Sequence, residues 1–104
     1  MEAAHERPLL LFFTSERSGP GRRMESLLAH LARKERARLR VSRIDVDRMP
    51  ELAQRLNVSG VPALVLVSGR RVVARLDGRA SAPRIEGMLA PHLDGAAAAP
   101  LRAA

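Results

Sequence analysis

The sequence predicts an α/β protein in which a mixed four-stranded sheet is flanked by helices, with the element order β-α-β-α-β-β-α. Two observations predict this class. A helical segment between the first two apolar strands favours a parallel crossover, and a tight turn between the last two strands predicts an antiparallel hairpin. The 104 residues support one compact domain with one hydrophobic core.

The first strand and the first helix follow from hydrophobic spacing. Residues 9–14 form a short apolar run, LLLFFT, which is typical of a strand buried on both faces. Ser18 followed by Pro20 is a helix-start signal, because serine caps helices and proline fits the first turn. Apolar residues then recur at helical spacing, which predicts a helix up to about Arg38; they are Met24, Leu27, Leu28 and Leu31.

The second strand and a short helix come next. The strand opens at Leu39, and two acidic residues, Asp45 and Asp47, stand at its carboxyl end. Asp47 is suited to cap a short helix over residues 49–56, because its side chain can accept a hydrogen bond from the first turn. Asn57 suits the left-handed conformation that ends such a helix.

The last third of the chain predicts a hairpin and a helix. Residues 63–67 and 72–76 are apolar strands, and the Ser-Gly-Arg sequence between them predicts a tight turn. Gly78 breaks the strand pattern. Ser81 then caps a last helix, whose apolar stripe is Ile85, Met88, Leu89 and Leu93.

The predicted domain organisation has three parts. Residues 1–8 are an N-terminal extension and residues 9–93 are the folded domain. Residues 94–104 are rich in alanine and proline and are predicted to be a flexible tail.

The composition excludes several kinds of chemistry. The chain contains no cysteine, which rules out disulfides, thiolate catalysis, cysteine-ligated zinc and iron–sulfur clusters. Three scattered histidines do not predict a metal site, and no cofactor is expected. The longest apolar run, residues 9–13, is far shorter than the ~20 residues of a membrane span. No cleavable signal pattern is visible, so we expect a cytoplasmic protein without a membrane partner.

The net charge of +7 comes almost entirely from arginine, because Lys34 is the one lysine among 18 basic residues. Such a bias, together with abundant alanine, is typical of a GC-rich coding sequence. A positive surface attracts polyanions, but nucleic-acid binding also calls for stacking aromatics, and the chain has only Phe12 and Phe13. A nucleic-acid partner is therefore not favoured.

Three segments resemble thioredoxin in order and spacing. Residues 11–21, LFFTSERSGPG, stand where that family has an apolar strand and a Trp-Cys-Gly-Pro-Cys turn. Residues 44–47, IDVD, are similar to its second core strand, and residues 56–64, LNVSGVPAL, to the segment that carries its cis-proline. The resemblance implies a thioredoxin-like fold with a cis peptide bond before Pro62. Few residues precede the first strand, so we expect an uncovered sheet edge and, as a hypothesis, a homodimer through it.

The resemblance also shows which chemistry is missing. Ser18 stands at the position of the attacking cysteine and Gly21 at that of the resolving cysteine, and neither side chain can exchange a disulfide. The degenerate active-site positions are Ser18, Gly19, Pro20 and Gly21. Phe12, Thr14 and Arg17 replace the family's buried Asp and two tryptophans. We interpret the chain as a redox-inactive member and not as an oxidoreductase.

Recognition of a protein or peptide is the function that such a scaffold can keep. In the family, backbone groups beside the proline pair with an extended peptide as a short strand. The corresponding groove here would be lined by Arg17, Ser18, Val61, Pro62 and Gly78. The alternative is that Pro62 only shapes the turn into the third strand.

Two further hypotheses remain open. One is a glutathione- or thiol-binding enzyme remnant that uses Ser18 and the cis-proline, because some glutathione transferases of the same fold use a serine at this position to hydrogen-bond the glutathione thiolate; against it, Ser18 can be a simple helix cap that accepts the Gly21 N–H. The other is that a cluster of basic residues binds a polyanion; the alternative is that this cluster is only a solvated helix end followed by a strand edge. Its basic residues would be Arg33, Lys34, Arg36, Arg38, Arg40 and Arg43.

Overall fold

The computed structural model describes residues 7–103, and the side chains of residues 7–93. Within this part of the chain, strands and helices follow in the order β-α-β-α-β-β-α, which confirms the predicted fold class. The elements are β1 (Leu9–Thr14), α1 (Gly19–Lys34), β2 (Arg40–Asp45), α2 (Pro50–Arg55), β3 (Ala63–Ser68), β4 (Arg71–Asp77) and α3 (Ala82–Ala103).

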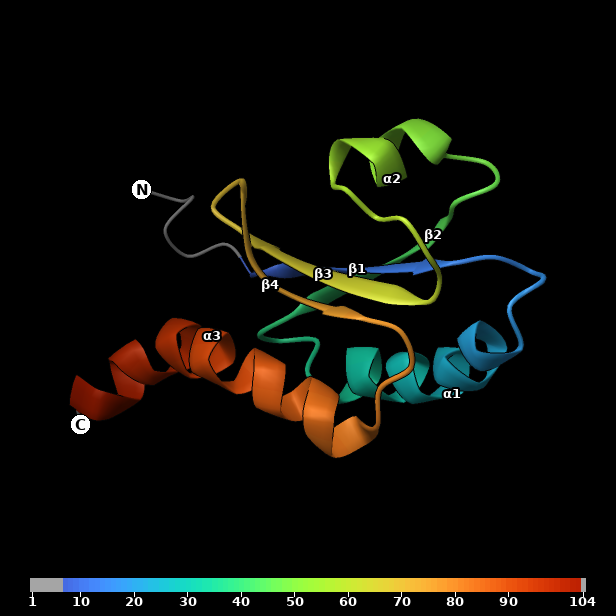
Figure 1. Ribbon diagram of the computed structural model, residues 1–104. Coiled ribbons are helices and arrows are strands. Elements are labelled where there is room, and N and C mark those ends of the chain that lie inside the picture. Colours follow the sequence, from blue (N-terminus) through green and yellow to red (C-terminus); the bar gives the residue numbers. More distant parts are fainter. Residues whose placement is uncertain (1–6, 104) are drawn as a thin grey trace.

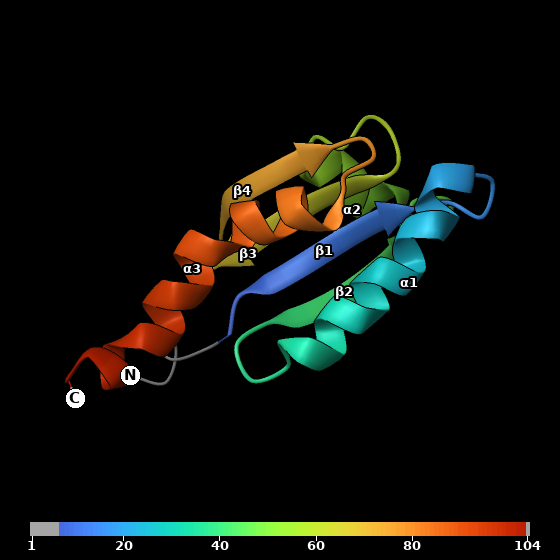
Figure 2. The same cartoon turned by 90° about the horizontal axis from the view of Figure 1, so that it is seen from below.

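The four strands form one mixed sheet in the order β2-β1-β3-β4. β1 pairs with β2 in parallel and with β3 antiparallel, and β3 and β4 form the predicted hairpin. Helices α1 and α3 cover one face of the sheet and α2 covers the other (Figure 1). Seen from the side of α1 and α3, β2 and β4 are the outer strands (Figure 2).

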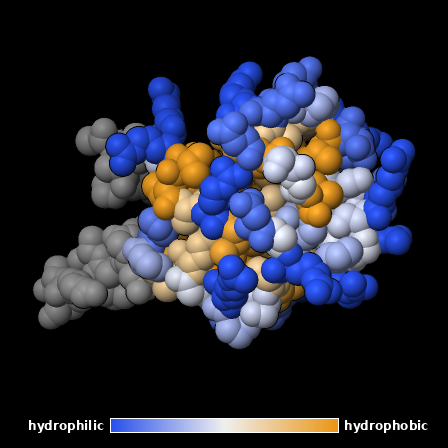
Figure 3. All heavy atoms as spheres, viewed as in Figure 1, coloured by the Kyte–Doolittle hydropathy of each residue, from blue (hydrophilic) through white to orange (hydrophobic). Residues whose placement is uncertain are grey.

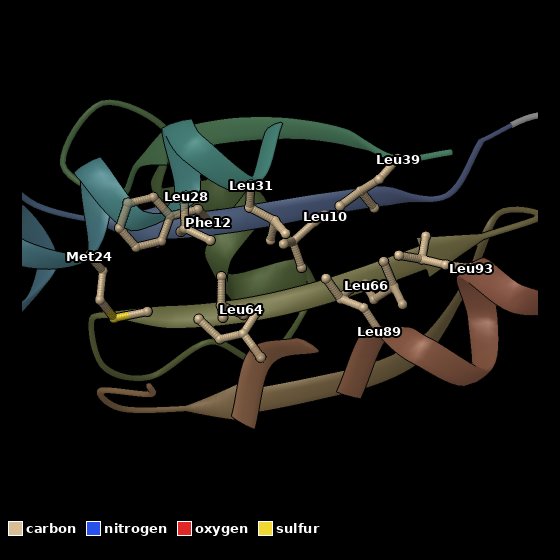
Figure 4. Packing of buried hydrophobic residues seen from close by; sticks show 11 residues of the cluster. Leu10, Phe12, Met24, Leu28, Leu31, Leu39, Leu64, Leu66, Leu89 and Leu93 are labelled. Carbon is tan, nitrogen blue, oxygen red and sulfur yellow. The ribbon is translucent and has the colours of Figure 1, made fainter. Parts of the chain in front are cut away.

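The core has two halves, one on each face of the sheet, because β1 alternates its side chains between them. Leu10 and Phe12 point toward α1 and α3, where they pack with Leu28 and Leu89 (Figure 4). Leu11 and Phe13 point the other way, toward the α2 side. This alternation explains why the whole run is apolar: burial on both faces removes the usual polar positions of a strand.

The hairpin turn consists of Gly69 and Arg70, whose φ angles are +59° and +68°. Two residues with positive φ define the type I′ turn, whose twist matches that of the flanking strands. The pairing register shifts between Leu66 and Val67, so one residue of β4 is left over as a β-bulge.

Helix α1 ends at Lys34, four residues before the predicted end at Arg38. The reason is local. The backbone N–H groups of Arg38 and Leu39 both donate to the carbonyl of Glu35, and the Arg38 guanidinium donates to the Glu35 carboxylate at 2.7 Å. The resulting turn brings Leu39 into the core, where it is buried.

The prediction that Asp47 caps the short helix is wrong. Met49 occupies the N-cap of α2, and no side chain donates or accepts a capping hydrogen bond there. The Asp47 carboxylate instead accepts a hydrogen bond from Ser15 Oγ at 2.8 Å. Asn57 has a φ of +59°, as its predicted role after the helix requires.

The last helix extends beyond its predicted apolar stripe. The sequence predicts a flexible tail from residue 94, whereas α3 continues to Ala103. Alanine has the highest helix propensity of all residues, and the run at residues 96–99 lets the helix continue. Most of the predicted N-terminal extension, residues 1–8, lies outside the described residues, as does residue 104.

The surface on the β4 side carries both hydrophobic and hydrophilic residues. In the view of Figure 3, hydrophobic residues in orange lie between hydrophilic residues in blue. Among the described helices, none combines the length and the apolar character that crossing a membrane would require.

Candidate functional site

Three loops meet at one end of the sheet because of its strand register. Phe13 at the end of β1 lies opposite Ala63 at the start of β3, and Ala63 lies opposite Asp77 at the end of β4. The loop after β1, the loop before β3 and the loop after β4 therefore share this end, on the right in Figure 1. The Gly78 N–H donates to the Pro62 carbonyl at 2.9 Å and joins two of these loops directly.

All predicted groove residues belong to these three loops or to the helix cap beside them. Arg17 and Ser18 follow β1, Val61 and Pro62 precede β3, and Gly78 follows β4. The peptide bond between Val61 and Pro62 is cis. The hydrogen bonds of the described residues link Pro62 to Gly78, but none links Ser18 to Val61 or Pro62.

Ser18 is the N-cap of α1, as the simple capping interpretation predicts. Its backbone is extended, with φ −87° and ψ 109°. Its hydroxyl accepts the Gly21 N–H at 2.9 Å, and its carbonyl accepts the Arg22 N–H at 3.1 Å. A cap of this kind contributes about 1 kcal/mol to stability.

The side chain of Thr14 fills the space beside Gly21 in the first turn of α1. Thr14 is completely buried, and its Oγ1 has no hydrogen-bond partner among the described residues. A Cβ on Gly21 would lie only 2.2 Å from this oxygen and 2.9 Å from Ser18 Oγ. At the position of the resolving cysteine, the structure therefore has room for glycine and for no larger residue without a shift of Thr14.

The sequence did not reveal this contact. The sequence showed only that Thr14 and Gly21 each replace the family's usual residue. A separation of seven positions in the sequence does not predict whether two side chains are in contact. The available signal was the pairing of two substitutions toward smaller residues at the strand end and in the first turn of the helix.

Ser15 holds the loop that precedes the cap, and the sequence analysis did not single it out. Its hydroxyl donates to Asp47 Oδ2 at 2.8 Å and accepts the Arg17 N–H at 3.2 Å. The Asp47 N–H in turn donates to Asp45 Oδ1 at 2.9 Å. Two loops that follow neighbouring parallel strands are thus tied together beside the helix start.

The basic residues named in the polyanion hypothesis lie at the end of α1 and along β2. Several already have acidic partners: Lys34 lies 3.5 Å from Glu86, and Arg43 Nε donates to Glu25 at 2.8 Å. Arg38 pairs with Glu35. These ion pairs reduce the positive charge that this surface presents to a polyanion.

No metal cluster is found in the described part of the chain. Within it, no three side chains of the types His, Cys, Asp and Glu gather closely enough to hold an ion. The groups present at this end of the sheet are backbone N–H and C=O groups, serine hydroxyls, the carboxylates of Asp45 and Asp47, and exposed arginine.

Comparison with known proteins agrees with the fold. The family model named Thioredoxin matches residues 2–91. The chain is 36% identical over 78 residues to Thioredoxin-1 of Drosophila yakuba, a match that spans 75% of this chain and 73% of that protein.

Solved structures give the same result. The crystal structure of the germline-specific thioredoxin Deadhead from Drosophila melanogaster superposes with a TM-score of 0.78 and 34% identity, over 86% of this chain and 85% of that one. The X-ray structure of Fasciola hepatica thioredoxin has a TM-score of 0.79 at 22% identity, over 88% and 86%. The chain belongs to the thioredoxin family, and it is a member without cysteine.

Proposed function

We propose that this chain is a redox-inactive thioredoxin-fold protein that binds an extended peptide segment of another protein beside Pro62. Disulfide exchange needs a thiolate, and the chain has none. The Thr14–Gly21 contact adds a steric reason, because a side chain at the second cysteine position would require the Thr14 side chain to shift. We therefore expect recognition without catalysis, and a cytoplasmic location remains part of the proposal.

The observation that carries the binding proposal is the free backbone of Val61. Neither its N–H nor its C=O takes part in a hydrogen bond within the described residues, although Val61 is half-buried and lies two residues before the start of β3. An extended peptide could pair with both groups and so add a short strand at this end of the sheet. Gly78 and Pro62 are already bonded to each other, which fixes the neighbouring loop as one wall.

Selection of random twelve-residue peptides against the whole protein, followed by amide chemical-shift mapping, tests this proposal. The selected peptides should perturb the amides of Arg17, Ser18, Val61 and Gly78 and should protect the Val61 N–H from exchange. Peptides that bind only elsewhere would contradict the proposal.

A matched pair of variants provides the control. A Cβ on Gly19, at the mouth of the site, or on Gly87, in α3, meets nothing within 4 Å. Both positions therefore accept a side chain without a clash. Gly19→Tyr should weaken peptide binding, because the ring would stand over the site, whereas Gly87→Tyr should leave binding unchanged.

The glutathione hypothesis remains a separate candidate for the same end of the sheet. Ser18 Oγ already accepts the Gly21 N–H, so a thiolate would have to receive a hydrogen bond from the hydroxyl while the cap stays in place. Titration with reduced glutathione should leave the Ser18 and Val61 amides unperturbed. Saturable shifts at both would favour glutathione over a peptide.

A further inference from the structure

The outer edge of β2 carries backbone groups that are free to pair with another strand. β2 is the last strand of the sheet on its side, and no described residue pairs with its outer edge (Figure 2). The N–H groups of Arg40 and Val46 donate at 2.9 and 3.0 Å to carbonyls of the β1 segment. Because a parallel strand turns alternate residues toward its neighbour, the N–H and C=O groups of Val41 and Arg43 point outward.

A cavity of about 310 Å³ lies directly beside this edge, between β2 and α1. Its lining consists of Phe12, Glu25, Leu28, Ala29, Ala32, Val41 and Arg43. Most of these side chains are apolar, and the polar pair among them is bonded to itself, since Arg43 Nε donates to Glu25 at 2.8 Å. A strand added to β2 would place every second side chain over this cavity.

The charge of the edge indicates which strand would fit. Exposed arginines line it: Arg40 and Arg43 belong to β2, and Arg48 follows in the next turn. The side chain of Arg48 is 82% exposed, and its Nε lies 4.0 Å from Asp45. The whole chain has a net charge of +7. Glu25 and Asp45 lie beside Arg43 and Arg48, but β2 itself still has two arginines and one acidic residue. A second copy would therefore bring a strand of the same sign, whereas an acidic strand would be attracted.

We propose that the outer edge of β2 binds an extended acidic segment of another protein, which adds to the sheet as a fifth strand and places alternate apolar side chains in the cavity between α1 and β2. Main-chain hydrogen bonds to Val41 and Arg43 would supply affinity, and the cavity and arginines would select the sequence. The arginines also protect the edge from pairing with basic or neutral strands. This site lies along the side of the sheet, separate from the loops around Pro62.

Two synthetic heptapeptides, acetylated and amidated, serve as probes for the isotope-labelled protein. One alternates glutamate with valine and the other alternates lysine with valine. The acidic peptide should bind saturably, protect the Val41 and Arg43 amides from exchange, and lose most of its affinity in high salt. The basic peptide should not bind.

Two alanine variants locate the site. Ala29 and Ala90 are both exposed helical residues, but Ala29 lines the cavity beside β2 and Ala90 lies on α3. Ala29→Glu should weaken binding of the acidic peptide about two- to fivefold through like-charge repulsion, whereas Ala90→Glu should not change it. Equal effects of the two variants would overturn the proposal.

The remaining outcomes are equally decisive. Protection of the Val41 and Arg43 amides in the free protein would show that the edge is already covered by the chain's own residues or by a second copy, and a dimeric mass in sedimentation would identify the second copy. Either result overturns the proposal, as does equal binding of the acidic and basic peptides. Failure of this test leaves the peptide site at Val61 unaffected, because the two sites have different amides.

Discussion

Replacing Gly21 with alanine tests directly whether Thr14 closes the degenerate active-site turn. The new Cβ would lie 2.2 Å from Thr14 Oγ1, which is about 1.2 Å closer than the 3.4 Å at which ordinary contacts begin. Thr14 is fully buried between the sheet and the helix start, so its side chain cannot move into solvent. Overpacking of this kind costs about 1–3 kcal/mol.

Helix propensity acts in the opposite direction and sets the size of the net effect. Gly21 lies within α1, where alanine is favoured over glycine by about 1 kcal/mol. We therefore expect Gly21→Ala to lower the free energy of unfolding by up to about 2 kcal/mol. Gly87→Ala is the matched control: a Cβ at Gly87 meets nothing within 4 Å, and this variant should be stabilised by about 0.5–1 kcal/mol. Urea denaturation measures both values.

A double-mutant cycle assigns the cost to Thr14. In a Thr14→Ala background the oxygen that meets the new Cβ is gone, so Gly21→Ala should cost about 1–2 kcal/mol less than in the native background. The loss of packing caused by Thr14→Ala itself cancels in the cycle. Stabilisation by Gly21→Ala equal to that of Gly87→Ala, or the same cost in both backgrounds, would refute the steric explanation.

Three further predictions concern the same turn. Ser18→Ala should lower the free energy of unfolding by about 1 kcal/mol, since the Gly21 N–H loses its acceptor; an unchanged urea midpoint would contradict the capping role. Ser15→Ala should cost about 1–2 kcal/mol, because a hydrogen bond to the Asp47 carboxylate is lost, and Asp47→Ala should add little to it in the double variant. The double variant Ser18→Cys/Gly21→Cys should show no disulfide reduction above the dithiothreitol background, and turnover comparable to that of a thioredoxin would contradict the closed turn.

The parts of the fold that depend on local spacing could be predicted from the sequence. Local sequence patterns predict three of the elements correctly: the apolar run of β1, the turn at Gly69 and the helical stripe of α1. The order of the elements along the chain then predicts how the strands are arranged in the sheet. The same holds for Ser18, whose capping bond reaches only three residues along the chain.

The features that sequence reasoning missed all depend on distant or competing partners. Asp47 has the right residue type to cap α2, but Ser15 lies within 2.8 Å of its carboxylate and is 32 residues away. Helix α1 ends at Lys34 and not at Arg38 as predicted, because the Glu35–Arg38 pair closes a turn that helical periodicity does not reveal. A sequence pattern indicates which hydrogen-bond partners a side chain could have, but the actual partner depends on which residues the fold brings close to it.

The contact between Thr14 and Gly21 bears on dithiol chemistry but not on the proposed peptide binding. A cysteine at residue 18 alone would have no resolving partner, and a cysteine at residue 21 requires the buried Thr14 side chain to shift. Restoration of a dithiol site therefore also needs a rearrangement of the side chain at residue 14. The free N–H and C=O of Val61, in contrast, depend on no side chain at residues 18 or 21. The proposed peptide recognition by backbone pairing therefore does not depend on the side chains that dithiol chemistry would need.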